Sequence, residues 1–303
     1  MTFEENTQML NIYRGILCSN PEFQAGKEVQ VEYRLHCPEY AQLRSRYELE
    51  KRAGRGSDLQ RAVRLMKYLA PRLSHSSWYD NHVPCNGLDL LAYSLDKPEQ
   101  GINCLNKAKI LEECCLAVGI YARRMRMLPY SPYDMDCHVV TEIYDRAEGR
   151  WCMLDPTTNG FLVDEQDRVL SLLEARARMA GAEFVTFRTA GCRTRDLEAI
   201  RRRNIGMNTY YAKNLFWLQA DAVSQFGETG RWLNFVPLHF SVHQNQVDNW
   251  KYRIAAFPEM ARQQGIDPAP LLERYRRRLA QVQAEPEAEP TAQAVLLAPP
   301  VEG

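Results

Sequence analysis

The sequence of 303 residues has no excess of charge of either sign, because 38 Lys and Arg side chains balance 38 Asp and Glu side chains. Proteins that bind nucleic acid or membrane surfaces draw affinity from surplus or clustered basic residues, so we expect neither partner. No stretch approaches 18 consecutive apolar residues, which predicts that no helix spans a membrane. The first ten residues have no basic leader and no apolar segment, so no secretory signal is expected.

Patterns that bind metals or phosphates are missing as well. The nine cysteines include no CxxC pair, and His239 and His243 have no Cys or acidic partner at ligand spacing. With no glycine-rich phosphate loop either, we expect no metal and no cofactor. Nine is an odd number, and a chain of this length buries roughly 75% of its unfolded surface without needing crosslinks. We therefore expect a reducing, cytoplasmic setting.

Composition and hydrophobic period divide the chain into four segments. We expect a helical and extended lead-in at residues 1–55, the main core at 56–190, and a mixed α/β extension packed on the core at 191–283. Residues 284–303 contain four prolines and four glutamates with almost no aromatic content, so they are predicted to form a disordered tail.

The hydrophobic period predicts an α+β fold, in which a central helix packs on an antiparallel sheet. Apolar residues recur at helical spacing up to residue 120, and the period then changes toward 2 between residues 120 and 155. Residues 231–257 carry aromatic and β-branched side chains at a density typical of strands. Helices are expected at 57–69, 88–94, 101–120, 169–180, 194–203 and 267–282.

Cys104 is the first residue of chemical interest, because it lies in the first turn of the most apolar of these helices. Asn103 is a good N-cap for that helix, and Gly119 is a good C-terminal stop. A thiol at this position faces the positive end of the helix dipole and unpaired backbone amides, which favour the thiolate and can bind an oxyanion. Cys114 and Cys115, in the middle of the same helix, are expected to pack in the core.

A predicted β-hairpin supplies a base and an acid for such a nucleophile. His138 begins one strand-like run, and Asp155 follows the run that returns after a short turn. If Tyr144 pairs with Gly149, His138 lies directly opposite Asp155, where cross-strand Cβ atoms are about 4.5–5.5 Å apart. Pro156 then ends the second strand. The residues therefore predict a Cys-His-Asp triad, although each of them alone is more often a packing residue.

Four runs of residues resemble the transglutaminase-like superfamily, in particular bacterial transglutaminase-like proteins of unassigned substrate. They are GINC (101–104), GIYAR (119–123), CHVVTEIY (137–144) and WCMLDPT (151–157). The superfamily pattern has a Cys at a helix start, G-I-P-A-R, an H-A-W-type strand, and W-x-x-x-D-P-T. Segments such as 81–94 and 210–217 extend the similarity to roughly residues 45–255.

The resemblance implies a core of papain/transglutaminase type in residues 56–190, with Cys104 as nucleophile, His138 as base and Asp155 as orienting acid. It implies acyl transfer, or amide or ester hydrolysis, through a thioester. The acyl donor is then a carboxamide, ester or peptide, and the acceptor is an amine or water. Tyr121 replaces the proline of G-I-P-A-R, and Val139 and Val140 replace Ala-Trp, so the acyl-binding groove is expected to differ.

Other interpretations share these residues. A cysteine peptidase uses the same triad, and a non-catalytic binding or scaffold module can be built on the same fold. The second oxyanion donor stays open among Asn103, Asn86 and Trp78, each of which also has an ordinary structural explanation. Cys137, next to His138, is expected on the opposite face of the sheet and to serve in packing, with a redox partnership to Cys104 as the alternative.

Overall fold

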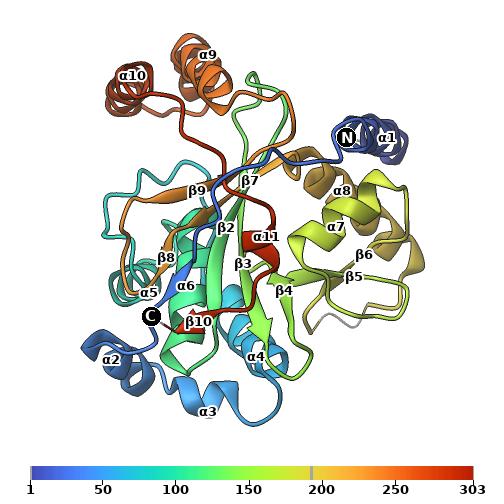
Figure 1. The fold of residues 1–303 in the computed structure, drawn as a ribbon. Helices are drawn as coiled ribbons and strands as arrows, with labels where there is room; N and C mark the ends of the chain where they lie inside the picture. Colours follow the sequence, from blue (N-terminus) through green and yellow to red (C-terminus); the bar gives the residue numbers. More distant parts are fainter. Residues whose placement is uncertain (1, 192–193, 303) are drawn as a thin grey trace.

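The computed structural model describes residues 2–191 and 194–302, and it has the α+β architecture that the sequence predicts. A five-stranded antiparallel sheet with the order β4-β3-β2-β7-β9 forms the centre (Figure 1). Its strands are β2 (Ala122–Leu128), β3 (His138–Asp145), β4 (Arg150–Leu154), β7 (Trp217–Asp221) and β9 (Trp232–Phe235).

One face of the sheet is covered by α6 (Cys104–Ala117), in which every residue from Asn106 onward is buried. The helix begins at Asn103, whose side-chain Oδ1 accepts a hydrogen bond from the backbone N–H of Asn106, and Gly119 follows its end with a φ of +75°. Four more helices surround α6 and complete this half of the core: α2 (Pro38–Arg46), α3 (Leu49–Ala53), α4 (Asp58–Leu69) and α5 (Gly87–Asp96).

The opposite face of the sheet packs against a second apolar cluster that includes α1 (Phe3–Cys18), α7 (Leu172–Ala180) and α8 (Leu197–Asn214). Short strands complete this side in two small sheets. One contains β10 (Val301–Glu302), β1 (Glu32–Tyr33) and β8 (Val223–Ser224), and the other contains β5 (Gly160–Val163) and β6 (Thr186–Thr189).

The strand prediction for residues 231–257 is correct only for β9, because most of this segment forms α9 (Val242–Gln263). Ser241 caps α9 by accepting a hydrogen bond from the backbone N–H of Gln244. Val247, Trp250, Ile254, Phe257 and Ala261 repeat at helical spacing, and this stripe decides the structure over the strand propensity of single residues. The stripe packs against α10 (Ala269–Ala284), a helix that the sequence predicted.

The prediction of a disordered tail is wrong for the end of the chain. Residues 294–297 form α11, and Val295 and Leu296 are 8% and 2% exposed in the second apolar cluster. The tail crosses the face of the sheet that lies away from α6 (Figure 1), where the carbonyl oxygen of Leu296 accepts from Arg123 and that of Ala298 from the indole N–H of Trp151. A short apolar run inside a Pro- and Glu-rich segment is thus sufficient for docking.

The hairpin register also differs from the prediction. Asp145 pairs with Arg150 and Thr141 with Leu154, so the strands are shifted by two residues relative to the pairing of Tyr144 with Gly149. Gly149, with a φ of +64°, closes the turn and therefore does not begin the strand. A shift of two residues preserves the face to which each side chain points, so His138 and Asp155 still share one face as diagonal neighbours.

None of the helices in the described part of the chain has the length and apolar character needed to cross a membrane. The division into segments at residues 55 and 190 stays a prediction.

Candidate active site

Three elements bring the predicted triad together where β3 begins and β4 ends. Cys104 is the first residue of α6, His138 is the first residue of β3, and Asp155 directly follows the last residue of β4. Thr141 donates its hydroxyl to the backbone carbonyl of Ala108, which holds α6 against β3 with its N-terminus near the start of that strand. His138 and Asp155 are 2% and 0% exposed, whereas Cys104 is half-buried.

His138 and Asp155 form a buried ion pair, with 2.8 Å between Nε2 of the imidazole and Oδ2 of the carboxylate. Burial alone lowers the pKa of His138. The Asp155 charge, the hydrogen bond that the imidazole donates to Asp155 and the interaction with Cys104 more than offset this effect and raise the pKa of His138 to about 10. Burial alone would raise the pKa of Asp155. The charge of His138 and its hydrogen bond to the carboxylate outweigh burial and lower the pKa of Asp155 to about 2. The pair is therefore ionised at neutral pH.

Cys104 acts on the same imidazole, because its side chain and its charge both favour the protonated form of His138. Since Asp155 occupies Nε2, Nδ1 is the ring nitrogen left for an interaction with the thiol. The chain of contacts therefore runs from sulfur to imidazole to carboxylate, in the order that nucleophilic catalysis requires.

The Asp155 carboxylate is held by further donors that fix its orientation. The backbone N–H groups of Thr157 and Thr158 donate to Oδ1 at 2.8 and 3.3 Å, and the hydroxyl of Tyr211 donates to Oδ2 at 2.6 Å. Tyr211 is fully buried and comes from α8. Its position in the core could have been predicted from helical spacing, but its contact with Asp155 depends on how α8 packs and has no local signal in the sequence.

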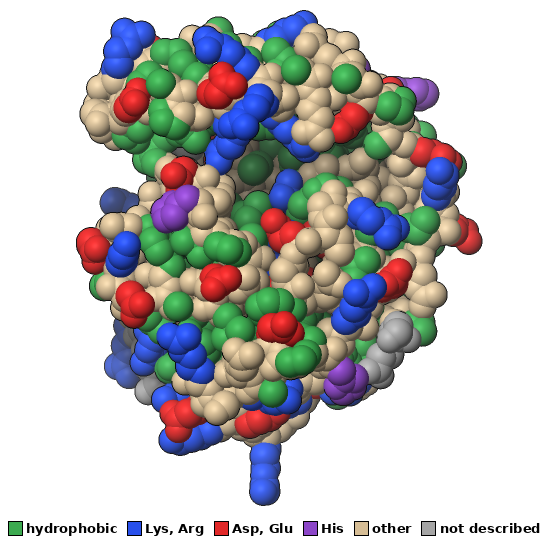
Figure 2. Space-filling view, turned by 90° about the vertical axis from the view of Figure 1, so that its left-hand side faces the viewer, with side chains coloured by type: hydrophobic (Ala, Val, Ile, Leu, Met, Phe, Trp, Pro, Cys, Tyr) green, Lys and Arg blue, Asp and Glu red, His purple; other side chains and the backbone are tan. Residues whose placement is uncertain are grey.

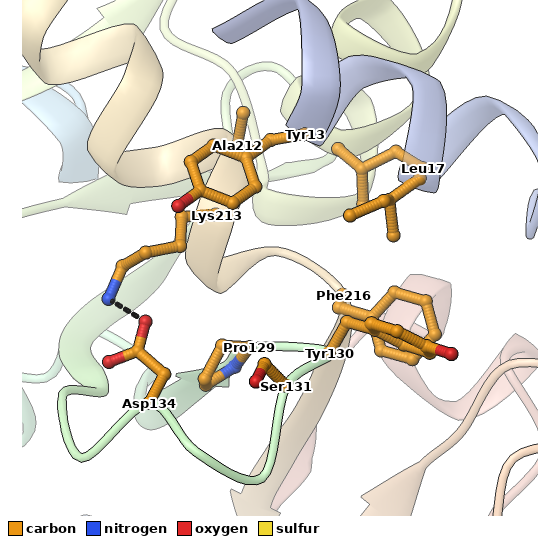
Figure 3. A pocket seen from close by; sticks show the side chains of 10 residues that line it. Tyr13, Leu17, Pro129, Tyr130, Ser131, Asp134, Ala212, Lys213 and Phe216 are labelled. Atoms are coloured by element: carbon orange, nitrogen blue, oxygen red, sulfur yellow. Dashed lines mark hydrogen bonds and ion pairs between the residues drawn. The ribbon is translucent and has the colours of Figure 1, made fainter. Parts of the chain in front are cut away.

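The segment that precedes His138 forms one rim of the site. Lys213 on α8 donates to Asp134 at 2.7 Å and to Asp136 at 3.0 Å, and the Tyr210 ring stands edge-on to His138 at a centroid distance of 5.1 Å. Figure 3 shows the Lys213–Asp134 pair at the edge of a small cavity of about 70 Å³, whose lining includes Tyr13, Leu17 and Phe216.

The opposite rim is the loop that precedes α6. His75 pairs with Ile102 in a single β-bridge, and Gly101, with a φ of +65°, permits this close approach. Two of the proposed oxyanion donors are occupied: the Asn103 amide donates to Asn81, and the Asn86 amide donates to Asp89. Trp78 is 38% exposed, with its ring 5.8 Å from that of Phe257.

The α9–α10 hairpin connects the two rims. Phe257 on α9 contacts Trp78, and Tyr252 on the same helix lies edge-on to Tyr133, with 5.5 Å between ring centroids. The side chain of Asn249 donates to the carbonyl oxygens of Pro132 and Asp134. Figure 2 shows a recess beneath the hairpin, which is the uppermost part of the molecule in that view.

Within the described ranges, no group of three or more His, Cys, Asp or Glu side chains is arranged to hold a metal ion. Comparison of the chain with protein-family models, with curated proteins and with solved structures found no match.

Proposed function

We propose that the chain is a transglutaminase-like thiol acyltransferase or hydrolase, and that α6 packed on the sheet is a core of papain/transglutaminase type. The observation that carries the proposal is the buried ion pair of His138 and Asp155 at the ends of β3 and β4, with the half-buried Cys104 acting on the same imidazole. The resemblance of the four sequence runs to the transglutaminase-like superfamily adds support, since it assigns the same three residues.

In the first half of the proposed reaction, the Cys104 thiolate attacks the carbonyl carbon of a carboxamide, ester or peptide. The first N–H groups of a helix have no intrahelical partner, so the backbone N–H of Cys104 is positioned to bind the oxyanion. The imidazolium of His138 gives its proton to the leaving amine or alcohol as the bond to the carbonyl carbon breaks. The product is a thioester on Cys104.

In the second half, His138 takes a proton from water or from an acceptor amine, which attacks the thioester. The carbon–sulfur bond breaks, and the thiolate and the imidazolium are restored. Asp155 keeps the imidazole in one orientation throughout, and Tyr211 and the Thr157 N–H hold the carboxylate in turn.

The test is a rapid-mixing measurement of p-nitrophenol release from a panel of p-nitrophenyl esters, followed by turnover with carboxamides. Wild-type protein should give a burst, whereas Cys104→Ala should give none. Asp155→Asn should lose about 10² to 10⁴ in rate, because the imidazole is no longer held in the reactive tautomer. Cys18→Ala is the matched control, since Cys18 is a more exposed thiol that lies outside the site and its loss should leave the burst intact.

A wild-type protein whose Cys104 is readily alkylated, but which gives no acylation with any ester or carboxamide, would contradict the proposal. A non-catalytic binding module would then be the better interpretation.

A further inference from the structure

A buried lysine lies one turn after the nucleophile. Lys107 is 2% exposed and follows Cys104 by three residues on α6, a spacing that places both side chains on the same side of the helix. Side chains of a helix lean toward its N-terminus, so Lys107 leaves the helix in the direction of the turn that carries Cys104.

Lys107 differs from the other buried lysine of the same helix. Lys109, 1% exposed, binds Glu112, Glu113 and the carbonyl oxygen of Gln225 at 2.7 to 3.3 Å. Among residues 2–191 and 194–302, by contrast, no hydrogen bond or ion pair engages Nζ of Lys107. Within the described residues, Nζ of Lys107 therefore has no hydrogen-bonded or ion-paired partner, whereas that of Lys109 has three.

The groups around Lys107 belong to the candidate active site. Burial lowers the pKa of Lys107, and the charges of Asp155 and Cys104 oppose this effect. The pKa of His75, on the loop that precedes α6, is lowered mainly by burial and further by the charge of Lys107. The charge of Lys107 thus acts on, or is acted on by, Cys104, Asp155 and His75.

The charge of the site explains why a cation is needed there. An ionised triad carries one negative charge on Cys104, one positive charge on His138 and one negative charge on Asp155, which leaves one negative charge uncompensated. An uncompensated charge in a partly buried site is unfavourable. One further positive charge beside the thiol makes the site neutral.

We propose that Lys107 is a positioning residue whose ammonium compensates the Cys104 thiolate and thereby maintains the ionised triad before the acyl donor binds. The inference rests on the proposed function and adds to it a fourth side chain. Once the thioester has formed, the sulfur is neutral and the ammonium faces Asp155 alone.

Several other titratable groups face Cys104 and Lys107, and they come from each surrounding element. They are His75 from the loop before α6, Asp136, Cys137 and His138 from β3 and the segment before it, Asp155 after β4, and Tyr210 from α8. In this set His138 and Lys107 bring positive charge at neutral pH, and Arg126 on β2 and Arg253 on α9 add positive charge that acts on Cys137. The pKa of His75 is lowered by its burial and by Lys107.

The experiment measures the rate at which iodoacetamide alkylates Cys104 as a function of pH, without any acyl donor. Lys107→Met keeps the length of the side chain but removes the charge. It should lower the rate near pH 6 at least about tenfold and move the profile toward higher pH, since a nearby positive charge favours the thiolate. Lys107→Arg retains the charge and should keep the wild-type profile.

Lys109→Met is the matched control. It removes a buried cation from the same helix and should lower the melting temperature while the alkylation profile stays in place. If the pH profile of alkylation is unchanged in Lys107→Met, the inference is overturned and the proposed function still stands. The same holds if a folded Lys107→Arg fails to keep the wild-type profile. If wild-type Cys104 reacts no faster than the exposed Cys18, the proposed function fails, and the inference fails with it.

Discussion

Replacing Tyr211 by Phe should destabilise the protein through one hydrogen bond. The Tyr211 hydroxyl donates to Asp155 at 2.6 Å, and it shares that carboxylate oxygen with His138. Phe keeps the ring and its packing against Phe187, so the change isolates the hydroxyl. A hydrogen bond to a charged group contributes about 1.5–3 kcal/mol, and a fully buried carboxylate cannot regain it from solvent.

The expected loss corresponds to a decrease of about 2 to 5 °C in the midpoint of thermal unfolding, which calorimetry measures directly. Tyr210→Phe is the matched control. Its hydroxyl lies 3.5 Å from the exposed Asp136, and its loss should change the free energy of unfolding by less than about 0.5 kcal/mol. Equal midpoints for wild-type protein and Tyr211→Phe would refute the structural role assigned to this tyrosine.

Two further predictions concern the tail and the ion pair. Leu296→Ala should lower the free energy of unfolding by about 2–5 kcal/mol because this side chain is buried. Leu297→Ala, at a position 61% exposed, should change it by less than about 0.5 kcal/mol. Chemical denaturation of both variants measures the difference, and equal losses would mean that the tail does not dock. The His138 imidazole should titrate near pH 10 in NMR spectra of the folded protein, and Asp155→Asn should return it toward 6.5. Because the pKa of His138 is raised in the folded protein, its contribution to stability is complete below about pH 6.5 and is lost as the pH rises through about 10. Because the pKa of Asp155 is lowered in the folded protein, its contribution is present above about pH 4 and is lost as the pH falls through about 2. A His138 resonance that titrates near pH 6.5 in wild-type protein would contradict the ion pair.

Local signals in the sequence were enough to place Cys104 at the start of a helix and His138 and Asp155 as neighbours on one face of the sheet. Asn103 and Gly119 mark the ends of α6 by capping chemistry, and the period of 2 after residue 120 marks β2 to β4. The hairpin register was wrong by two residues, but the alternation of side chains across a strand makes that error harmless for His138 and Asp155.

Contacts between segments distant in the sequence could not be predicted in the same way. Tyr211 reaches Asp155 across 56 residues of sequence, and only the packing of α8 brings them together. Lys107 sits on a helix that was predicted correctly, yet a lysine on an apolar helix gives no local indication of whether its charge is paired. The tail was misjudged because its overall composition outweighed the three apolar residues that precede Ala298, two of which are buried.

The most direct test of the central claim is to locate the acyl group by peptide mapping after brief incubation with p-nitrophenyl acetate and quenching in acid. The account predicts a single acetyl adduct on the peptide that contains Cys104, and its loss in His138→Ala. An adduct distributed over the exposed cysteines, or one that forms equally well in His138→Ala, would show that Cys104 is not an activated nucleophile.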